Sequence, residues 1–310
     1  MPLQTTEHMN EQARALDTRA PMDILSILHQ GQVAAAKSVE LCTNEIAIAA
    51  GLAANAISDG GRLVYAAAGS SGLMAMADGL ELPGTYGIST DQLIIKLAGG
   101  MNNLTSLPGG PEDDEAGAGR EVMDASLSSK DCLIAISASG TTPYALGALR
   151  AAKELGAATI AIANNAPTPL LEEADVSIFL ETPPEVIAGS TRMGAGTAQK
   201  IALNMLSTLM AVHLGHVHDG HMVNLKADNV KLKQRANRIV ASVTNCSAEA
   251  AERHLEAADG SAKLAILLAA GAQNRVDAQA LLDINAQKLR PSLASLEGLN
   301  KTKQEGAQGV

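Results

Sequence analysis

Residues 62–87 constrain the fold more than any other part of this sequence. They begin with a short apolar run, residues 63–68, which predicts a buried strand. Four small residues, 69–72, follow as a tight loop, and an apolar helical run then ends at Pro83 and Gly84. A strand, a Ser/Gly loop and a helix in this order are typical of an α/β sheet that offers backbone N–H groups to an anion.

The composition indicates an aliphatic core. A chain of 310 residues can bury a large one, and 46% of the residues are hydrophobic but only 1% are aromatic. A core of Ala, Leu, Ile, Val and Met favours close packing of helices on a sheet. The formal net charge of −10 argues against nucleic acid as a partner. A small anionic ligand remains compatible with it, because loop donors act locally.

The sequence predicts a cytoplasmic protein. Cys42, Cys132 and Cys246 are few and widely spaced, as in a reduced compartment. Residues 1–30 lack the basic and apolar pattern of a secretory leader. No apolar run reaches the roughly 20 residues that span a bilayer, so no membrane partner is expected.

Further strands are expected at α/β spacing. The apolar runs are residues 92–97, 132–137, 158–163 and 176–180. Helical stretches lie between most of them, which predicts a parallel sheet covered on both faces. The connection 98–131 differs. Its first part is rich in Gly and acidic residues, so we expect a long functional loop outside the core.

Helices are expected before, between and after the strands of this sheet. Residues 1–20 are polar and predict an extended arm, and residues 301–310 are expected to fray. The expected helices are residues 22–29, 33–59, 143–155, 194–214, 224–242, 247–258, 262–270 and 276–286.

The segment 137–142, SASGTT, contains four hydroxyls and one Gly directly after a predicted strand. Capping of the helix that Pro143 opens would explain one Thr. It does not explain a second Ser/Gly loop, at residues 69–72, in the same place of another strand–helix unit. We therefore favour a phosphate site. Neither the P-loop pattern nor a dinucleotide fingerprint is present, so a monophosphate fits best.

Glu81 and Glu112 are the candidates for acid–base chemistry. Taken singly, Glu81 is typical of a solvated helix end, and the Glu112-Asp113-Asp114 cluster is typical of a helix N-terminus. Both follow predicted strands, in segments that could converge on the rim where α/β sheets bind ligands. The pair suggests a phosphorylated substrate and a proton to move.

Four histidines near residue 215 allow two interpretations. His213, His216, His218 and His221 could be metal ligands. They lie around Gly215 at a helix end, however, where His is favourable with the helix dipole. No Cys is nearby, and we expect no metal.

Taken together, these segments resemble the N-acetylmuramic acid 6-phosphate etherases, a family of the sugar-isomerase (SIS) class. The resemblance runs from about residue 6 to residue 236. The segments that carry it are GGRLVYAAAGSSG, ELPGTYG, the EDD triplet, SASGTTPY and GSTRMGAGTAQKIALNMLST, the last of which is specific to etherases and close relatives.

The resemblance implies an α/β fold: an SIS-type parallel sheet flanked by helices, with an N-terminal helical arm and a small C-terminal helical (UBA-like) domain. The implied boundaries are 1–45 for the arm and its helix, 46–240 for the phosphosugar-binding catalytic domain and 241–310 for the helical domain. It also implies a homodimer without metal or redox cofactor. The residues implied around the sugar phosphate are Ser70, Ser71, Ser137, Ser139 and Thr141.

The sequence departs from the family pattern at a few positions. Leu73 stands where the first loop usually has Arg, and Gly194 stands where the last segment usually has Lys. Ser70 replaces Thr, Gly84 replaces a second Pro, and Gly-Gly-Pro precedes Glu112. Two positive charges are lost in this way, which bears on the substrate more than on the fold.

The resemblance implies a lyase in cell-wall amino-sugar recycling. It would cleave the D-lactyl ether of N-acetylmuramic acid 6-phosphate to N-acetylglucosamine 6-phosphate and D-lactate, with Glu81 and Glu112 as the acid–base pair. Our hypothesis within this pair is that Glu81 is the acid and Glu112 the base. Another SIS-class phosphosugar isomerase, or a non-catalytic phosphosugar-sensing regulator, remains an alternative. Two carboxylates favour an enzyme, because a sensor needs only the phosphate loops.

A shared dimer interface is also expected from residues 189–210. Residues 194–198 are all small, and the turns that follow are apolar around most of the helix. Such a helix must be buried on several sides, so we expect a partner subunit to cover it.

Overall fold

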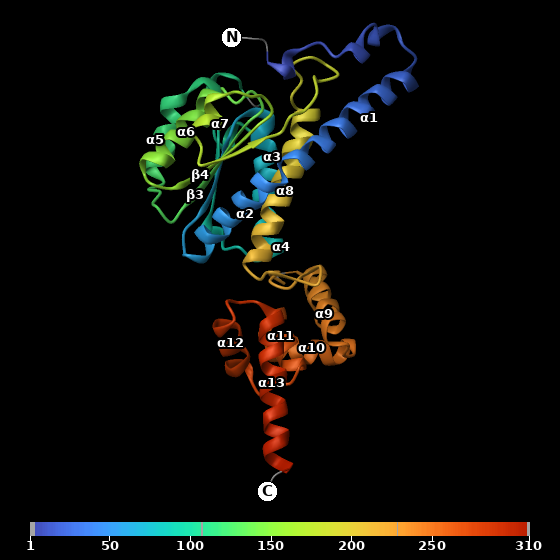
Figure 1. Cartoon of the computed structure of the whole chain (residues 1–310), viewed down its shortest axis with the longest axis vertical. Helices are drawn as coiled ribbons and strands as arrows, with labels where there is room; N and C mark the ends of the chain where they lie inside the picture. Colours follow the sequence, from blue (N-terminus) through green and yellow to red (C-terminus); the bar gives the residue numbers. More distant parts are fainter. Residues whose placement is uncertain (1–3, 107, 228, 309–310) are drawn as a thin grey trace. The chain divides into compact units, whose positions relative to one another are not determined.

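The computed structural model describes residues 4–106, 108–227 and 229–308 (Figure 1). The chain divides into two compact units. The first consists of Met1–Leu80 and Thr90–Leu209 and contains the sheet. The second consists of Met210–Val310 together with the short segment Glu81–Ser89.

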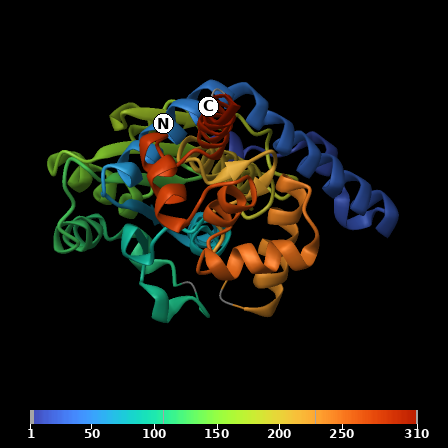
Figure 2. The same cartoon turned by 90° about the horizontal axis from the view of Figure 1, so that it is seen from below.

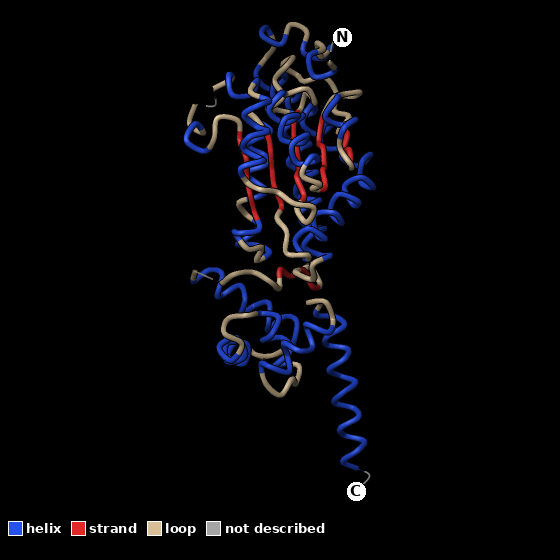
Figure 3. Tube along the Cα trace, turned by 90° about the vertical axis from the view of Figure 1, so that its left-hand side faces the viewer, coloured by secondary structure: helices blue, strands red, loops and turns tan. Residues whose placement is uncertain are grey.

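A parallel five-stranded sheet forms the centre of the first unit (Figure 3). Its order is β2-β1-β3-β4-β5, so the chain reverses its direction of winding between β1 and β3. All five predicted strands are confirmed, with small shifts at their ends. They are β1 (Leu63–Ala67), β2 (Leu93–Leu97), β3 (Cys132–Ser137), β4 (Ala158–Ala163) and β5 (Val176–Phe179).

Helices cover both faces of this sheet (Figure 1). On one face, α5 (Glu115–Asp124), α6 (Pro143–Glu154) and α7 (Pro169–Glu173) pack on alternate residues of the strands. On the other, α2 (Thr43–Ser58) and α3 (Gly69–Gly79) contact β1 and β3. Because both faces are covered, β1 and β3 are buried at every residue, which explains their unbroken apolar runs.

Two sequence predictions in the first unit are wrong. The expected helix break near residue 30 is absent, because α1 (Pro21–Ser38) is continuous and the break falls at η4 (Val39–Cys42). Gly31 instead allows close packing, since a Cβ there would lie 2.7 Å from Cγ2 of Val186. The connection 98–131 is also not wholly outside the core. Its helix α5 buries Ala118 and Val122, whose i,i+4 spacing is hidden among Gly and acidic residues.

The chain itself covers part of the helix after the sheet, and Met205 remains 38% exposed, so coverage by a partner stays a prediction. This helix is α8 (Gly194–His213), and the chain itself buries Ala195, Ala198 and Ala202 completely. The small residues permit close approach within the protomer. Substitution at Ala198 would therefore test the core of this chain rather than a dimer interface.

The N-terminal arm is folded against its own unit rather than extended. It forms three short turns, η1 (Thr5–Glu7), η2 (Glu11–Ala13) and η3 (Leu16–Thr18). Thr6 is buried, and its carbonyl accepts a hydrogen bond from Gly189 N at 2.8 Å. The following helix α1 projects from the sheet in two views (Figures 1 and 2). Its side chains Met22 and Leu25 are exposed.

One stretch of the described residues, Pro21–Ser58, is long and apolar enough to cross a membrane. This stretch is not expected from the sequence, because polar residues interrupt its apolar runs. It corresponds to α1, η4 and α2, and 44% of its apolar window is buried inside the protein. Core helices of water-soluble proteins have the same length and composition, so this is weak evidence for a membrane.

The second unit is almost entirely helical (Figure 3). The three predicted tail helices are confirmed, and Ile266 and Leu267 of the second one are completely buried in their shared core. A small hairpin and α13 are not predicted, and residues 301–308 continue α13 instead of fraying; residues 309 and 310 lie outside the described residues. The elements are β6 (Val217–His218), β7 (His221–Met222), α9 (Val230–Thr244), α10 (Ala248–Ala257), α11 (Ala262–Ala269), α12 (Arg275–Ile284) and α13 (Leu289–Gln308).

Candidate active site

Both Ser/Gly segments lie where the sheet reverses its winding. Ligands of open α/β sheets bind at the carboxyl ends of the strands at this point. The segment after β1 is the first turn of α3 rather than a loop, because the helix begins at Gly69. The first N–H groups of a helix have no intrahelical partner. Gly69, Ser70 and Ser71 therefore present backbone donors that suit an anion.

The segment after β3 gathers its hydroxyls into one cluster. The Oγ of Ser137 lies 2.7 Å from Oγ1 of Thr142 and 3.1 Å from Oγ of Ser139. The backbone N–H and the hydroxyl of Thr141 both donate to Oγ of Ser139 at 3.2 Å. The N–H of Gly140 donates to Oγ of Ser137 at 3.0 Å. The structure thus brings the hydroxyls of Ser137, Ser139, Thr141 and Thr142 together, and their role around a phosphate stays a prediction.

Thr142 occupies the N-cap position of α6 but does not act as a cap. Among the described residues, its side chain makes no capping hydrogen bond to the helix. Its hydroxyl lies instead within 2.7 Å of Ser137 and 3.3 Å of Ser139. Capping alone therefore does not account for the hydroxyls of this segment.

Glu112 lies beside the first turn of α3. It belongs to η7 (Gly110–Asp113), and a Cβ placed on Gly69 would be only 2.7 Å from its Oε1. Partial burial raises the pKa of the Glu112 carboxyl, and the negative charge of Asp113 raises it further. A carboxylate with a raised pKa is a stronger base, and this one lies next to the backbone donors of Gly69.

Glu81 is placed differently from the other candidates. It is exposed and directly precedes α4 (Leu82–Tyr86), so Pro83 and Gly84 continue helical structure instead of ending it. Glu81 belongs to the second compact unit, whereas Glu112 belongs to the first. Joint action of Glu81 and Glu112 on one substrate stays a prediction.

The N-terminal arm supports the hydroxyl cluster, which the sequence does not indicate. The side-chain amide of Gln4 donates to the Ser139 carbonyl at 3.0 Å. Asn165 Nδ2 donates to Thr6 Oγ1 at 3.0 Å and to the Ala138 carbonyl at 2.8 Å. The arm is polar and has no periodic pattern of apolar residues, so its sequence gives no signal for such a contact. The contact depends on where the fold places Asn165.

The structure explains one departure from the family pattern. The buried carboxylate of Glu185 accepts hydrogen bonds from Gly194 N at 2.9 Å and Ala195 N at 2.8 Å, which caps α8. A Cβ at Gly194 would lie 3.0 Å from Glu185 Oε2 and 3.1 Å from Cβ of Ala35. A glycine therefore fits the tight space at this helix start.

The histidines do not form a metal site in the described part of the chain, where no group of three or more His, Cys, Asp or Glu side chains is placed to hold an ion. Burial and, to a smaller degree, the positive charge of Lys263 lower the pKa of His216 to about 4. The ring is therefore neutral at pH 7.

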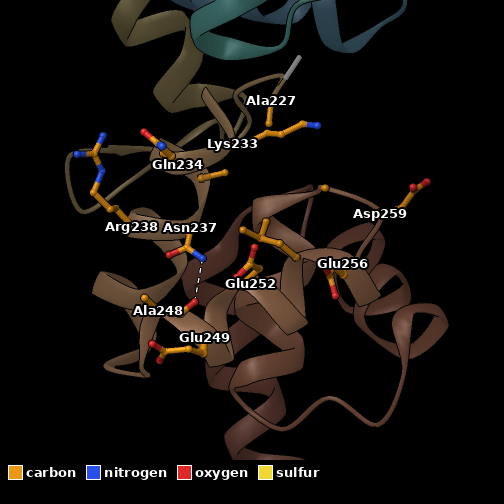
Figure 4. A pocket seen from close by; sticks show the side chains of 13 residues that line it. Ala227, Lys233, Gln234, Asn237, Arg238, Ala248, Glu249, Glu252, Glu256 and Asp259 are labelled. Carbon is orange, nitrogen blue, oxygen red and sulfur yellow. Dashed lines mark hydrogen bonds between the residues drawn. The ribbon is translucent and has the colours of Figure 1, made fainter. Parts of the chain in front are cut away.

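A pocket of about 1040 Å³ lies in the second unit, between α9 and α10 (Figure 4). Its walls carry opposite charges. Lys233 and Arg238 come from α9, whereas Glu249, Glu252 and Glu256 come from α10. The residues that line it include none of the site residues predicted from the sequence.

Comparisons with known proteins match one part of the chain to a domain family and most of the chain to etherases. Residues 114–214 match the family model described as SIS domain. One solved structure, a phosphoheptose isomerase from Francisella tularensis, aligns with a TM-score of 0.48 at 16% identity, over 63% of this chain and 100% of that chain. The matched model and the sheet define an SIS-domain protein.

Two relatives define the family more closely. N-acetylmuramic acid 6-phosphate etherase from Deinococcus radiodurans is 41% identical over 263 residues, which are 85% of this chain and 86% of that protein. The etherase from Bacillus subtilis is 40% identical over 279 residues, 90% of this chain and 92% of that protein. The chain belongs to the N-acetylmuramic acid 6-phosphate etherase family.

Proposed function

We propose that this protein is a carbon–oxygen lyase of cell-wall amino-sugar recycling. It cleaves the D-lactyl ether of N-acetylmuramic acid 6-phosphate to N-acetylglucosamine 6-phosphate and D-lactate. The observation that carries this proposal is the 40–41% identity to etherases over nearly the whole of both chains. The hydroxyl cluster after β3 supports it, because hydroxyl and backbone N–H donors at this edge of the sheet can hold a sugar phosphate.

The phosphate is held by the two serine segments in this proposal. Ser70 and Ser71 contribute from the first turn of α3, and Ser137, Ser139 and Thr141 contribute from the cluster after β3. Hydroxyls and backbone N–H groups neutralise part of a phosphate charge through hydrogen bonds. Each such bond to a charged oxygen contributes about 1.5–3 kcal/mol.

Ser139→Ala is expected to weaken binding of the phosphosugar by about tenfold or more, because it removes a donor to a charged oxygen. Ser71→Ala should do the same from the other segment. Isothermal titration with N-acetylglucosamine 6-phosphate measures both. Ser128→Ala, which removes a hydroxyl bonded to Asp131 away from this edge, is the control. Unchanged affinity in both test variants would place the phosphate elsewhere.

The reaction needs one base and one acid. In the open-chain aldehyde, the carbonyl acidifies the proton at C2. Glu112 removes this proton, and its raised pKa suits a base that works near neutral pH. Glu81 protonates the lactyl oxygen as the C3–O bond breaks. Water then adds to the unsaturated aldehyde at C3, and a proton returns to C2.

Asp113→Asn is expected to shift the acid limb of the activity profile to lower pH. The negative charge of Asp113 is the second cause, after burial, of the raised pKa of Glu112. Removing it lowers this pKa, so the base stays ionised in more acidic solution. The measurement is kcat/KM for lactate release between pH 4 and 8. An acid limb that stays in place, or moves upward, would argue against Glu112 as the base.

Purified protein with N-acetylmuramic acid 6-phosphate tests the proposed function directly. D-lactate should form, and no ketose phosphate should form from hexose 6-phosphates. Aldose–ketose conversion without lactate would indicate an SIS-class isomerase instead. Binding without either reaction would indicate a phosphosugar sensor.

The protein is further proposed to be a cytoplasmic homodimer. The projecting helix α1 supports a self-association surface, because Met22 and Leu25 lie on one face and are 74% and 56% exposed. We expect Leu25→Glu to shift the protein toward monomer in light scattering at micromolar concentration. Asp23→Ser, on the same helix, is the control. A Leu25→Glu variant of unchanged mass would exclude this face as the interface.

A further inference from the structure

The short helix α4 is fastened at its C-terminal end to the helical unit. The side-chain amide Nδ2 of Asn224 donates a hydrogen bond to the Tyr86 carbonyl at 3.0 Å. Gly87, which follows, has a φ of +65°. A Cβ at Gly87 would lie 2.2 Å from the backbone oxygen of Asn224, so the two chain segments touch through their backbones. The ring of His216 also hydrogen-bonds to the Tyr86 backbone.

The elements behind these contacts are firmly held. His216 precedes the hairpin of β6 and β7, and Asn224 follows it. The N–H of Val223 donates to the His216 carbonyl at 3.0 Å, which ties the two ends of the hairpin together. His216 is mostly buried next to Lys263 of α11. The donors that reach Tyr86 therefore come from the folded body of the unit.

The helix α4 itself is short, and its side chain Leu82 is buried. It is five residues long, and Glu81 precedes it. A helix of this length is not stable alone, because the few hydrogen bonds of one turn do not offset the conformational entropy that the turn loses when it forms. Within it, Thr85 N donates to the Glu81 carbonyl at 3.0 Å, and Gly87 N donates to the Pro83 carbonyl at 3.1 Å. The turn is thus a single connected unit between Glu81 and the fastened Tyr86.

We propose that Asn224 is a positioning residue for Glu81: by holding the Tyr86 carbonyl, it fixes the turn that presents this carboxyl group to the lactyl oxygen. The C-terminal unit then takes part in lactate release and not in proton removal at C2. This inference rests on the proposed role of Glu81 as the acid. It assigns a role in catalysis to a hydrogen bond between residues that are 138 positions apart in the sequence.

The test uses the full-length protein and two readouts in deuterated water. One is total deuterium at C2 of substrate and product, and the other is D-lactate. For Asn224→Ala we expect lactate release to fall about tenfold, the equivalent of one hydrogen bond, while C2 exchange stays at the normal rate. Asn224→Asp keeps the side-chain shape but has no N–H to donate, so it should behave in the same way.

Asn237→Ala is the matched control. Its Nδ2 donates to the Ala248 carbonyl at 2.9 Å, the same chemistry between α9 and α10. It should leave both rates normal. If both rates fell equally in the folded Asn224→Ala and Asn224→Asp proteins, or if neither rate changed, the proposal would be overturned. Failure of the proposed function itself looks different, because the unaltered protein would then release no lactate.

Discussion

Glu112→Gln protein is expected to lose both C2 exchange and lactate release, each by roughly 10²–10⁴-fold, the usual contribution of a general base or acid. Glutamine has nearly the same shape but cannot take up a proton. Glu81→Gln is expected to lose lactate release by a similar factor and to keep C2 exchange. Exchange in deuterated water followed by NMR, beside an enzymatic D-lactate assay, separates the two steps.

Glu115→Gln is a suitable control for this pair. Glu115 is close to Glu112 in the sequence, but it is exposed and pairs with Arg150 at 2.6 Å. Its substitution should change neither step. If Glu112→Gln still exchanged the C2 proton at the normal rate, another group would be the base. If Glu81→Gln lost exchange and Glu112→Gln did not, the two roles would be reversed.

Gly69→Ala is expected to reduce C2 exchange by about 10²-fold although it removes no functional group. A Cβ at Gly69 would lie 2.7 Å from Oε1 of Glu112, so the carboxylate must move. A misplacement of about 1 Å can cost a factor of this size. The positive φ of +50° adds backbone strain, of about 1–2 kcal/mol, at the start of α3.

Gly60→Ala separates these two effects. Gly60 also has a positive φ, +77°, but a Cβ there would meet nothing within 4 Å. It should lower the melting temperature in the same way as Gly69→Ala and leave exchange intact. Normal exchange in Gly69→Ala would mean that Glu112 is not near its working position in this structure.

The sheet could be predicted from sequence because each strand is an uninterrupted apolar run between turn residues. In a parallel strand covered on both faces, polar residues do not alternate with apolar ones, so the ends of the strand are easy to locate in the sequence. The residues of β3 show this most clearly. The serine segments could be predicted for a related reason, since they follow β1 and β3 directly. The chain order alone places them at one edge of the sheet.

The remaining features depend on contacts between distant residues. Glycine usually destabilises a helix interior, yet Gly31 lies inside α1. Val186 packs against it and leaves no room for a Cβ. The support of the Ser139 backbone by Gln4 spans 135 positions and leaves no periodic signal. Likewise, nothing local shows that the segment Glu81–Ser89 groups with the C-terminal helices, because Asn224 holds it from 138 positions away.

Two departures from the family pattern illustrate the same limit. A Cβ at Gly194 meets Glu185 and Ala35 at close range, so the surroundings favour glycine. A Cβ at Gly84 meets nothing within 4 Å, so nothing in the structure explains why proline is absent there. From the sequence alone, the two glycines cannot be distinguished, because each only replaces the residue that is usual in the family.

The most direct measurement is the fate of two isotopes when the protein cleaves N-acetylmuramic acid 6-phosphate in deuterated, ¹⁸O-enriched water. Elimination followed by water addition breaks the C3–O bond. It predicts one deuterium at C2 and ¹⁸O in the C3 hydroxyl of N-acetylglucosamine 6-phosphate, with unlabelled ether oxygen retained in the released D-lactate. Cleavage on the lactyl side would instead put ¹⁸O into lactate and leave C2 without deuterium, and that result would contradict the account.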